Sequence, residues 1–336
     1  MFLPSTRRGE DNGPNRFSSP RRALEQRKAG GAEGSATGQG HLGYPSSPPT
    51  VCHGDRFSAR AIVLQQKTQR PIQFEITPAT REAVEAGMVR PLKVLASLAL
   101  IKNDYESARA LYERSLAIHR QLGNQLGVAS SLNNLGLVAL DQADYSRARS
   151  LFEESLAIQR QLGDKAGTAT SLSNLGLLAY ELDDCASARL RLNESLTISR
   201  QLAYPTGIAA ALCYLGYVET EDGAPLAARA LHLESVAMRL ELGDRRGVAE
   251  SLEGLSSLAL AMGEPLAAAC ICGAAERVRC DINSPMPIGQ RPRYERSVQA
   301  ARAKCADDAA FDAAWRVGSA MTMEQAIAFA KQADAD

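Results

Sequence analysis

The chain has 336 residues, and its 38 basic and 38 acidic side chains give a formal net charge of zero. Such a balance gives the whole chain no electrostatic attraction for nucleic acid, so we expect no direct binding of DNA or RNA. No apolar run approaches the roughly 18 residues of a membrane span, and no apolar secretory core follows the amino terminus, which predicts a cytoplasmic protein. The seven cysteines and four histidines complete no zinc-binding spacing, so we predict no metal and no cofactor.

Residues 1–54 are predicted to form a disordered tail. The first 50 residues are rich in Gly, Pro, Ser and Arg and show no apolar period. A segment of this composition cannot bury enough apolar surface to offset the entropy lost on ordering. We interpret its basic residues as solvated charges in preference to nucleic-acid contacts; they are Arg7, Arg8, Arg16, Arg21, Arg22, Arg27 and Lys28.

Residues 55–86 have a different pattern. Two short β-prone runs, 61–64 and 72–76, flank the polar residues 67–71, which predicts a β-hairpin followed by a helical start at 81–86. The string VLQQKTQRPIQFEITPATREAVEA resembles the catalytic-domain hairpin of phage-type tyrosine recombinases (integrases). That resemblance implies a strand-cleavage role for Lys67, but the chain lacks the family's His-x-x-Arg box and tyrosine nucleophile. We therefore predict an integrase-like fragment without recombinase activity.

Residues 87–283 contain five copies of a 40-residue unit. Each copy holds two amphipathic segments separated by a polar break, such as residues 141–144 in the second copy. A fixed period of this length, filled with helix-forming residues, predicts a stack of antiparallel helix hairpins. Each copy opens on a leucine, at Leu95, Leu135, Leu175, Leu215 and Leu255.

The helix ends are marked at the same place in successive copies. Aspartates suited to the N-cap and prolines suited to the first helical position begin the second helix. Glycines suited to a left-handed C′ position end it, and the fifth copy has Asn283 there. The aspartates are Asp104, Asp144 and Asp184, the prolines Pro225 and Pro265, and the glycines Gly123, Gly163 and Gly243.

The alternation of small and large residues in the second copy resembles the tetratricopeptide repeat. It is carried by Leu135, Gly136, Ala139, Ala148 and Phe152. The 40-residue form resembles the repeats of kinesin light chains and the MalT-like repeats of bacterial signal-transduction (STAND) ATPases. This resemblance implies an all-α, right-handed superhelical solenoid.

Residues 284–336 are predicted to form a helical cap of three helices. Tyr294 begins the first, Phe311 and Trp315 belong to the second, and residues 322–325 form a capping box that starts the third. The segment resembles the carboxyl-terminal end of STAND ATPase transcriptional regulators of the LuxR and winged-helix types. The resemblance covers only their sensor half, and the chain has no phosphate-binding loop.

The sequence predicts a binding module and no enzyme, because no catalytic motif occurs in it. Asparagine amides on the concave face can pair with the main chain of an extended peptide, and kinesin light chains use asparagine in this way. Polar side chains that bond to one another are an equally weighted alternative. The predicted peptide-binding residues are Asn133, Asn134, Ser173, Asn174, Tyr180, Tyr214 and Tyr217.

We therefore expect a non-catalytic scaffold that binds a protein or peptide on its concave face. Its resemblances imply the detached sensor module of a signal-responsive transcriptional regulator. The alternative is a truncated or chimeric gene product with folded repeats and no present ligand. The sequence predicts nothing about the oligomeric state.

Overall fold

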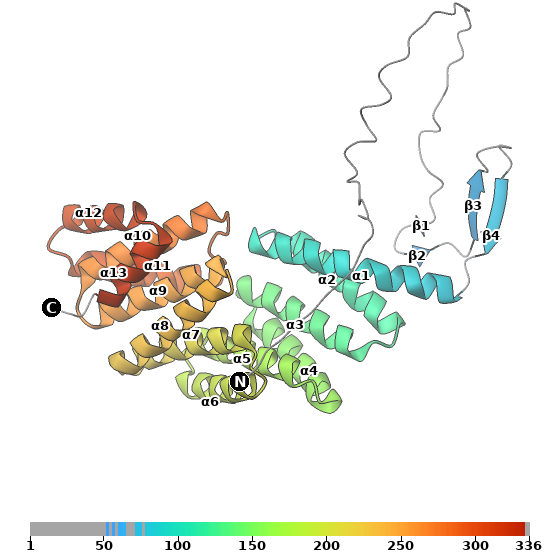
Figure 1. Cartoon of the computed structure of the whole chain (residues 1–336), viewed down its shortest axis with the longest axis horizontal. Helices are drawn as coiled ribbons and strands as arrows, with labels where there is room; N and C mark the ends of the chain where they lie inside the picture. The colour runs from blue at the N-terminus through green and yellow to red at the C-terminus, as the bar shows by residue number, and fades with distance from the viewer. Residues whose placement is uncertain (1–51, 54–55, 58–59, 65–70, 76–77, 333–336) are drawn as a thin grey trace, which may run out of the picture. The chain divides into compact units, whose positions relative to one another are not determined.

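The computed structural model describes residues 52–332, apart from 54–55, 58–59, 65–70 and 76–77 (Figure 1). The chain divides into two compact units, residues 1–74 and 75–336. The predicted disordered tail lies outside the described residues except for Cys52–His53. In the first unit, β1 (Cys52–His53) pairs antiparallel with β2 (Arg56–Phe57).

The hairpin predicted in the integrase-like segment is present as two strands. β3 (Arg60–Leu64) and β4 (Pro71–Glu75) are hydrogen-bonded neighbours in one two-stranded sheet. Lys67 lies outside the described residues. The predicted boundary between residues 86 and 87 falls inside a continuous helix, α1 (Pro78–Ile101), whereas the division between the compact units falls at residues 74 and 75.

The repeats form the predicted helix hairpins over residues 78–281 (Figure 1). Each repeat has a first and a second helix, joined by a short turn. After α1 the repeat helices are α2 (Tyr105–Gln121), α3 (Gln125–Asp141), α4 (Tyr145–Leu162), α5 (Lys165–Glu181), α6 (Cys185–Gln201), α7 (Pro205–Glu221), α8 (Pro225–Glu241), α9 (Arg245–Ala261) and α10 (Pro265–Asp281). The predicted all-α solenoid is confirmed.

First helices of successive repeats contact one another directly. α3 packs against α5, α5 against α7 and α7 against α9, in addition to the contacts within each hairpin. We call the surface formed by these first helices the inner face. No helix among the described residues is both long and apolar enough to cross a lipid bilayer.

The predicted helix caps are in place. Asp144 Oδ1 accepts a hydrogen bond from the Arg147 amide (3.2 Å), and Asp104 and Asp184 cap their helices in the same way. The prolines at 225 and 265 begin α8 and α10. Left-handed residues follow every second helix of the repeats: Gly123, Gly163, Ala203, Gly243 and Asn283. Each turn is thus set by local chemistry.

Small residues on the first helix face large residues on the second. A Cβ on Gly136 would lie 2.5 Å from the Phe152 ring, and a Cβ on Gly216 would lie 2.6 Å from the His232 ring. His232 is fully buried, and burial lowers its pKa to about 3. It is therefore a neutral packing residue in the place of Phe152.

A column of buried serines joins neighbouring helices. Ser155 Oγ donates to the Ala129 carbonyl of α3 (2.8 Å) and lies 3.3 Å from Ser171 Oγ of α5. The serine at 235 makes the equivalent bonds two repeats further along. These bonds satisfy buried polar groups while keeping the helices close together.

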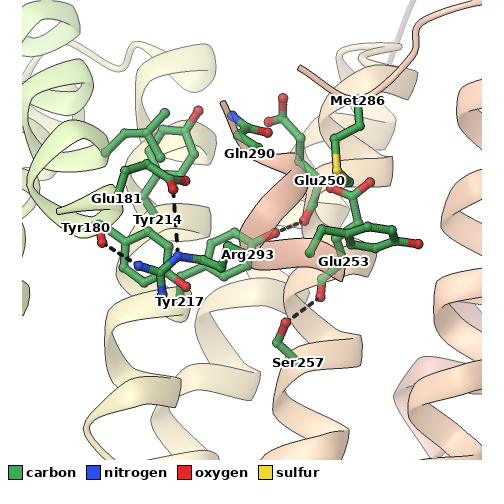
Figure 2. Close-up of a pocket in the computed structure, with 12 residues that line it drawn as sticks. Tyr180, Glu181, Tyr214, Tyr217, Glu250, Glu253, Ser257, Met286, Gln290 and Arg293 are labelled. Atoms are coloured by element: carbon green, nitrogen blue, oxygen red, sulfur yellow. Dashed lines mark hydrogen bonds and ion pairs between the residues drawn. The ribbon is translucent and has the colours of Figure 1, made fainter. Parts of the chain in front are cut away.

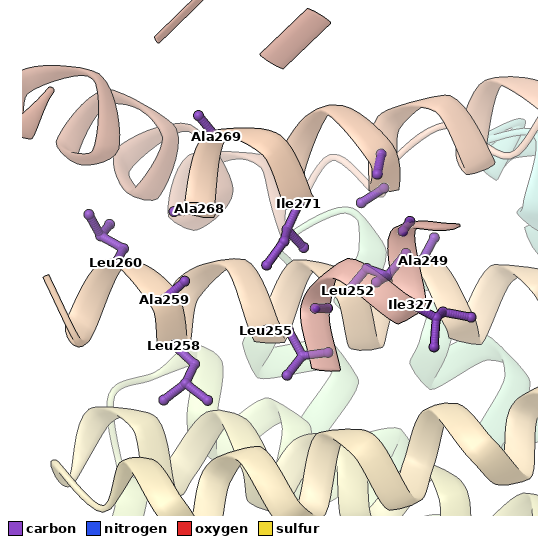
Figure 3. Close-up of a cluster of buried hydrophobic side chains, with 14 of the residues drawn as sticks. Ala249, Leu252, Leu255, Leu258, Ala259, Leu260, Ala268, Ala269, Ile271 and Ile327 are labelled. Atoms are coloured by element: carbon purple, nitrogen blue, oxygen red, sulfur yellow. The ribbon is translucent and has the colours of Figure 1, made fainter. Parts of the chain in front are cut away.

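Three helices follow the repeats where the cap was predicted: α11 (Arg291–Lys304), α12 (Asp308–Ser319) and α13 (Met323–Gln332). They pack on α9 and α10, and Ile327 of α13 enters the apolar cluster shown in Figure 3. A Cβ on Gly318 would lie 1.8 Å from the Cys270 carbonyl oxygen. The backbones of α12 and α10 are therefore too close together for any side chain at position 318. The capping box is formed by reciprocal bonds between Thr322 and Gln325.

Candidate functional site

An irregular segment of the chain lies across the repeats. Residues 284–290, which we call the strap, join α10 to α11 without helix or strand. The Met286 carbonyl accepts a hydrogen bond from Asn103 Nδ2 (3.0 Å), and the Ile288 amide donates to the Tyr105 hydroxyl (3.2 Å). The strap therefore leaves the fifth repeat and has its main chain held by side chains of the first.

Gly289 is the point where the strap comes closest to the second repeat. Its amide donates a hydrogen bond to the Asp141 carbonyl at the end of α3 (2.8 Å). A Cβ on Gly289 would lie 2.5 Å from the Leu140 carbonyl oxygen and 3.2 Å from the Ala143 amide nitrogen. Main-chain atoms cannot move aside as a flexible side chain can, so this contact requires glycine.

The first turn of α11 places one arginine in a cradle on the third and fourth repeats. The guanidinium carbon of Arg293 lies 4.2 Å from the ring centroid of Tyr180, and its Nη2 donates to the Tyr180 carbonyl (2.9 Å). Carboxylate oxygens of Asp183 (2.5 Å), Glu221 (3.1 Å) and Glu181 (3.7 Å) complete the shell, and Figure 2 shows Arg293 beside Tyr180 and Glu181. We call Tyr180, Glu181, Asp183 and Glu221 the arginine cradle.

The acidic residues of this surface recur with the period of the repeat. Asp141, Glu181 and Glu221 are the last residues of α3, α5 and α7, where the helix dipole already concentrates negative potential. Burial raises the pKa of Glu181, and the positive charge of Arg293 partly offsets that increase. Two of these carboxylates, Glu181 and Glu221, lie one repeat apart and both face Arg293.

A small pocket lies under the strap and beside the cradle (Figure 2). Its volume is about 60 Å³, room for roughly four water molecules at about 15 Å³ each. The rings of Tyr180 and Tyr217 are 5.5 Å apart in its wall. The lining residues are Leu177, Tyr180, Glu181, Tyr214, Tyr217, Glu250, Glu253, Ser257, Met286, Gln290, Arg293 and Tyr294.

Buried ion pairs fix the helices that form the wall of this pocket. Arg239 of α8 pairs with Glu250 of α9 (3.0 Å), and Arg279 of α10 pairs with Glu253 of α9 (2.9 Å). Removing one partner of such a pair would leave a buried charge uncompensated. We infer that these four residues stabilise the wall of the pocket.

The structure brings together the three tyrosines that the sequence analysis singled out. Tyr180, Tyr214 and Tyr217 all line the pocket. Burial raises the pKa of each of them, so the three hydroxyls are neutral at physiological pH. Tyr180 also supplies the ring and the carbonyl that hold Arg293.

The structure differs in one respect from the predicted binding of a peptide by asparagine amides on the concave face. A peptide clamp requires these amides to face solvent, and that requirement is wrong for Asn133 and Asn174, which are only 6% and 8% exposed. Asn174 Nδ2 donates to Asn133 Oδ1 (3.0 Å), and Ser171 Oγ donates to the same oxygen (3.2 Å). Ser173 is buried as well, and only Asn134 is partly exposed. The first helices pack closely enough to cover this column, which helical periodicity alone did not reveal.

The sequence analysis missed the strap and the arginine cradle. The signal for the cradle was present, because an acidic residue recurs at 141, 181 and 221, and three arginines follow the last repeat at 291, 293 and 296. What could not be derived was the path of the strap. It depends on the curvature of the stacked repeats, which returns residues 286–293 to the first four of them.

Comparison with known proteins relates part of the chain to a repeat family. A tetratricopeptide-repeat family model matches residues 89–161 and 128–201, and such repeats generally bind protein partners. A search of curated proteins returned no match. The resemblances to recombinases and to STAND regulators remain predictions.

One similar solved structure is the crystal structure of BtubC (BKLC) from P. vanneervenii. The two chains are 21% identical, and the match covers 60% of this chain and 84% of that one, with a TM-score of 0.46.

Proposed function

We propose that this protein is a scaffold that binds an extended segment of a partner protein along the path taken by its own strap. The observation that carries the proposal is the way the strap is held. Asn103, Tyr105 and the Asp141 carbonyl bind only main-chain atoms of the strap. Contacts of this kind give affinity for any extended segment that fits, while side-chain pockets supply selectivity.

The binding path also has room for side chains. Met286 and Gln290 of the strap line the pocket beside the tyrosines. Tyrosine rings offer flat apolar area with little loss of conformational entropy, which suits them to contact different side chains. The tyrosine part of the predicted binding surface is thus retained in this proposal, and Asn103 takes the amide role first assigned to Asn174.

A finer proposal is that the scaffold is the detached sensor module of a signal-responsive transcriptional regulator. It is supported by the helical cap, in which Phe311 and Trp315 pack 5.6 Å apart and the capping box opens the last helix. These features match the pattern on which the resemblance to the regulators rests. The alternative, a truncated or chimeric gene product with folded repeats and no ligand, predicts that the face binds nothing.

The proposal is tested by releasing the strap. Gly289→Val would force a side chain against the Leu140 carbonyl and expel the strap, whereas the repeats keep their own cores. We expect a fluorescent peptide of residues 284–296 to bind this variant at least tenfold more tightly than wild type, because the tethered strap competes at an effective concentration in the millimolar range. Fluorescence anisotropy gives both dissociation constants.

Gly87→Val is the matched control, because Gly87 has open space around its Cβ position. It should bind the peptide like wild type. If Gly289→Val remains helical and melts cooperatively but binds no peptide, the proposed function is wrong and the alternative without a ligand is favoured.

A further inference from the structure

The arginine cradle places an oxygen atom near each nitrogen of one guanidinium. Nη2 donates to the Tyr180 carbonyl and Asp183, Nη1 donates to Glu221, and Nε lies 3.7 Å from Glu181 as an ion pair without a hydrogen bond. The ring of Tyr180 lies under the guanidinium plane. A planar fork with an aromatic ring beneath it fits arginine, whereas the ammonium of lysine carries its three donors on one nitrogen and cannot span acceptors spread around a guanidinium.

The cradle carries more negative charge than its occupant neutralises. Three carboxylates surround the single guanidinium of Arg293, and Asp183 and Glu221 are themselves 79% and 50% exposed. This surface therefore favours a segment in which arginine is accompanied by other basic residues.

The helices that carry the cradle pack against one another without α11. All of the cradle residues belong to α5, α7 and the turn after α5, and the apolar cluster beneath the cradle is formed by buried residues between Ala139 and Val218. No residue of α11, α12 or α13 belongs to that cluster among the described residues. Arg293 therefore lies on a surface whose packing does not depend on α11, and another arginine side chain can displace it.

We propose that the cradle is a recognition site for an arginine side chain of the partner, and that Arg293 occupies it as a competing internal ligand. The inference rests on the proposed function and names its partner class, an extended basic segment centred on an arginine. Such a segment binds only when Arg293 leaves the cradle. The strap and the first turn of α11 therefore lower the apparent affinity of the cradle for the segment.

The test compares three synthetic peptides of residues 284–296 on the Gly289→Val chain. One keeps the arginine at position 293, one has lysine there, and one has citrulline, which has the shape of arginine without its charge. We expect the arginine peptide to bind at least tenfold more tightly than the citrulline peptide and several-fold more tightly than the lysine peptide. Its affinity should fall with added salt.

A second arm removes charge from the cradle. Asp183→Asn with Glu221→Gln should abolish the preference for arginine over citrulline, and Asn is tolerated at the left-handed backbone of Asp183. Glu113→Gln with Glu194→Gln changes the same charge at exposed pairs with Arg147 and Arg160 and should leave the preference intact.

The outcomes separate the two proposals. If all three peptides bind equally well, arginine recognition is wrong and the peptide-binding scaffold stands. If the cradle variant keeps the full preference for arginine, recognition occurs elsewhere and the assignment of the cradle is wrong. If no peptide binds, the proposed function fails, and the inference fails with it.

Discussion

The guanidinium of Arg293 lies 4.2 Å from the ring centroid of Tyr180, although the two residues are 113 positions apart in the chain. One belongs to the helix that follows the last repeat and the other to the end of α5 in the third repeat. Their contact shows that the chain folds back over its own inner face. A stack of hairpins that was expected to present an open surface thus presents one that is already partly occupied.

The buried amide pair on the inner face can be tested by two neighbouring substitutions. Asn133→Ala should lower the free energy of unfolding by about 1–3 kcal/mol, because it removes the acceptor shared by Asn174 and Ser171. Asn134→Ala should change it by less than about 0.5 kcal/mol, since that side chain is partly exposed. Urea unfolding of both variants gives the comparison. Equal losses would show that the amide network does not stabilise the fold.

Local chemistry made much of the fold predictable from the sequence. The 40-residue period located the hairpins, and the N-caps at Asp104, Asp144 and Asp184 placed the start of the second helices. The same period left burial on the inner face undetermined, because whether Asn133 contacts solvent depends on how closely α3 and α5 pack. The path of the strap depends on superhelical curvature, a property of the whole stack that no single repeat encodes.

The first repeat shows the same distinction between local and global features. Leu92, Leu95 and Leu98 are three apolar residues at helical spacing in α1. Leu95 and Leu98 are about half exposed, whereas Leu92 is buried. The helical pattern identified the apolar residues of α1, but it could not say which of them α2 covers.

Asp141 gives the stability a distinct pH dependence. Burial raises its pKa to about 7, an increase that Arg246 only partly offsets and Glu250 reinforces. The folded state therefore keeps a proton that the unfolded state releases near pH 4. The free energy of unfolding should consequently fall as the pH rises from about 4 to 7.

Asp141→Asn should remove that loss. Above pH 7 the variant should be more stable than wild type by roughly 2–4 kcal/mol, and near pH 4 the two should be similar. Denaturant unfolding at pH 4.5 and pH 8 measures both values, with the exposed Glu154→Gln as a control. A variant that is destabilised equally at both pH values would show that Asp141 is not held protonated.

The helix ends contain a strained residue. Ala203 has φ of 48° at the position where other repeats have Gly163 (69°) and Gly243 (68°). The left-handed region costs a residue with a Cβ about 1–2 kcal/mol, partly offset by the greater entropy of glycine in the unfolded chain. Ala203→Gly should therefore raise the free energy of unfolding by about 0.5–1 kcal/mol, and Gly163→Ala should lower it by a similar amount. Thermal melts with the same sign of shift for both variants would contradict this account.

Close helix contacts should not tolerate a larger side chain. Ala188 is fully buried, and its carbonyl lies beside the Cβ position of Gly176. Ala188→Leu should overpack this contact and cost roughly 1–3 kcal/mol. The matched substitution Ala186→Leu, at an exposed position of the same helix, should have little effect. Unchanged melting of Ala188→Leu would argue against the packing described.

The central claim is that the strap occupies a peptide-binding face and yields it to a competing segment. The most direct measurement is a nuclear magnetic resonance titration of the ¹⁵N-labelled wild-type chain with an unlabelled peptide of residues 284–296. We predict that the amide signals of Ile288 and Gly289 move to the positions of a free segment as the peptide saturates the face, because their bonds to Tyr105 and Asp141 are lost. If those two signals stay at their original positions while the peptide is bound, the peptide binds elsewhere and the claim is contradicted.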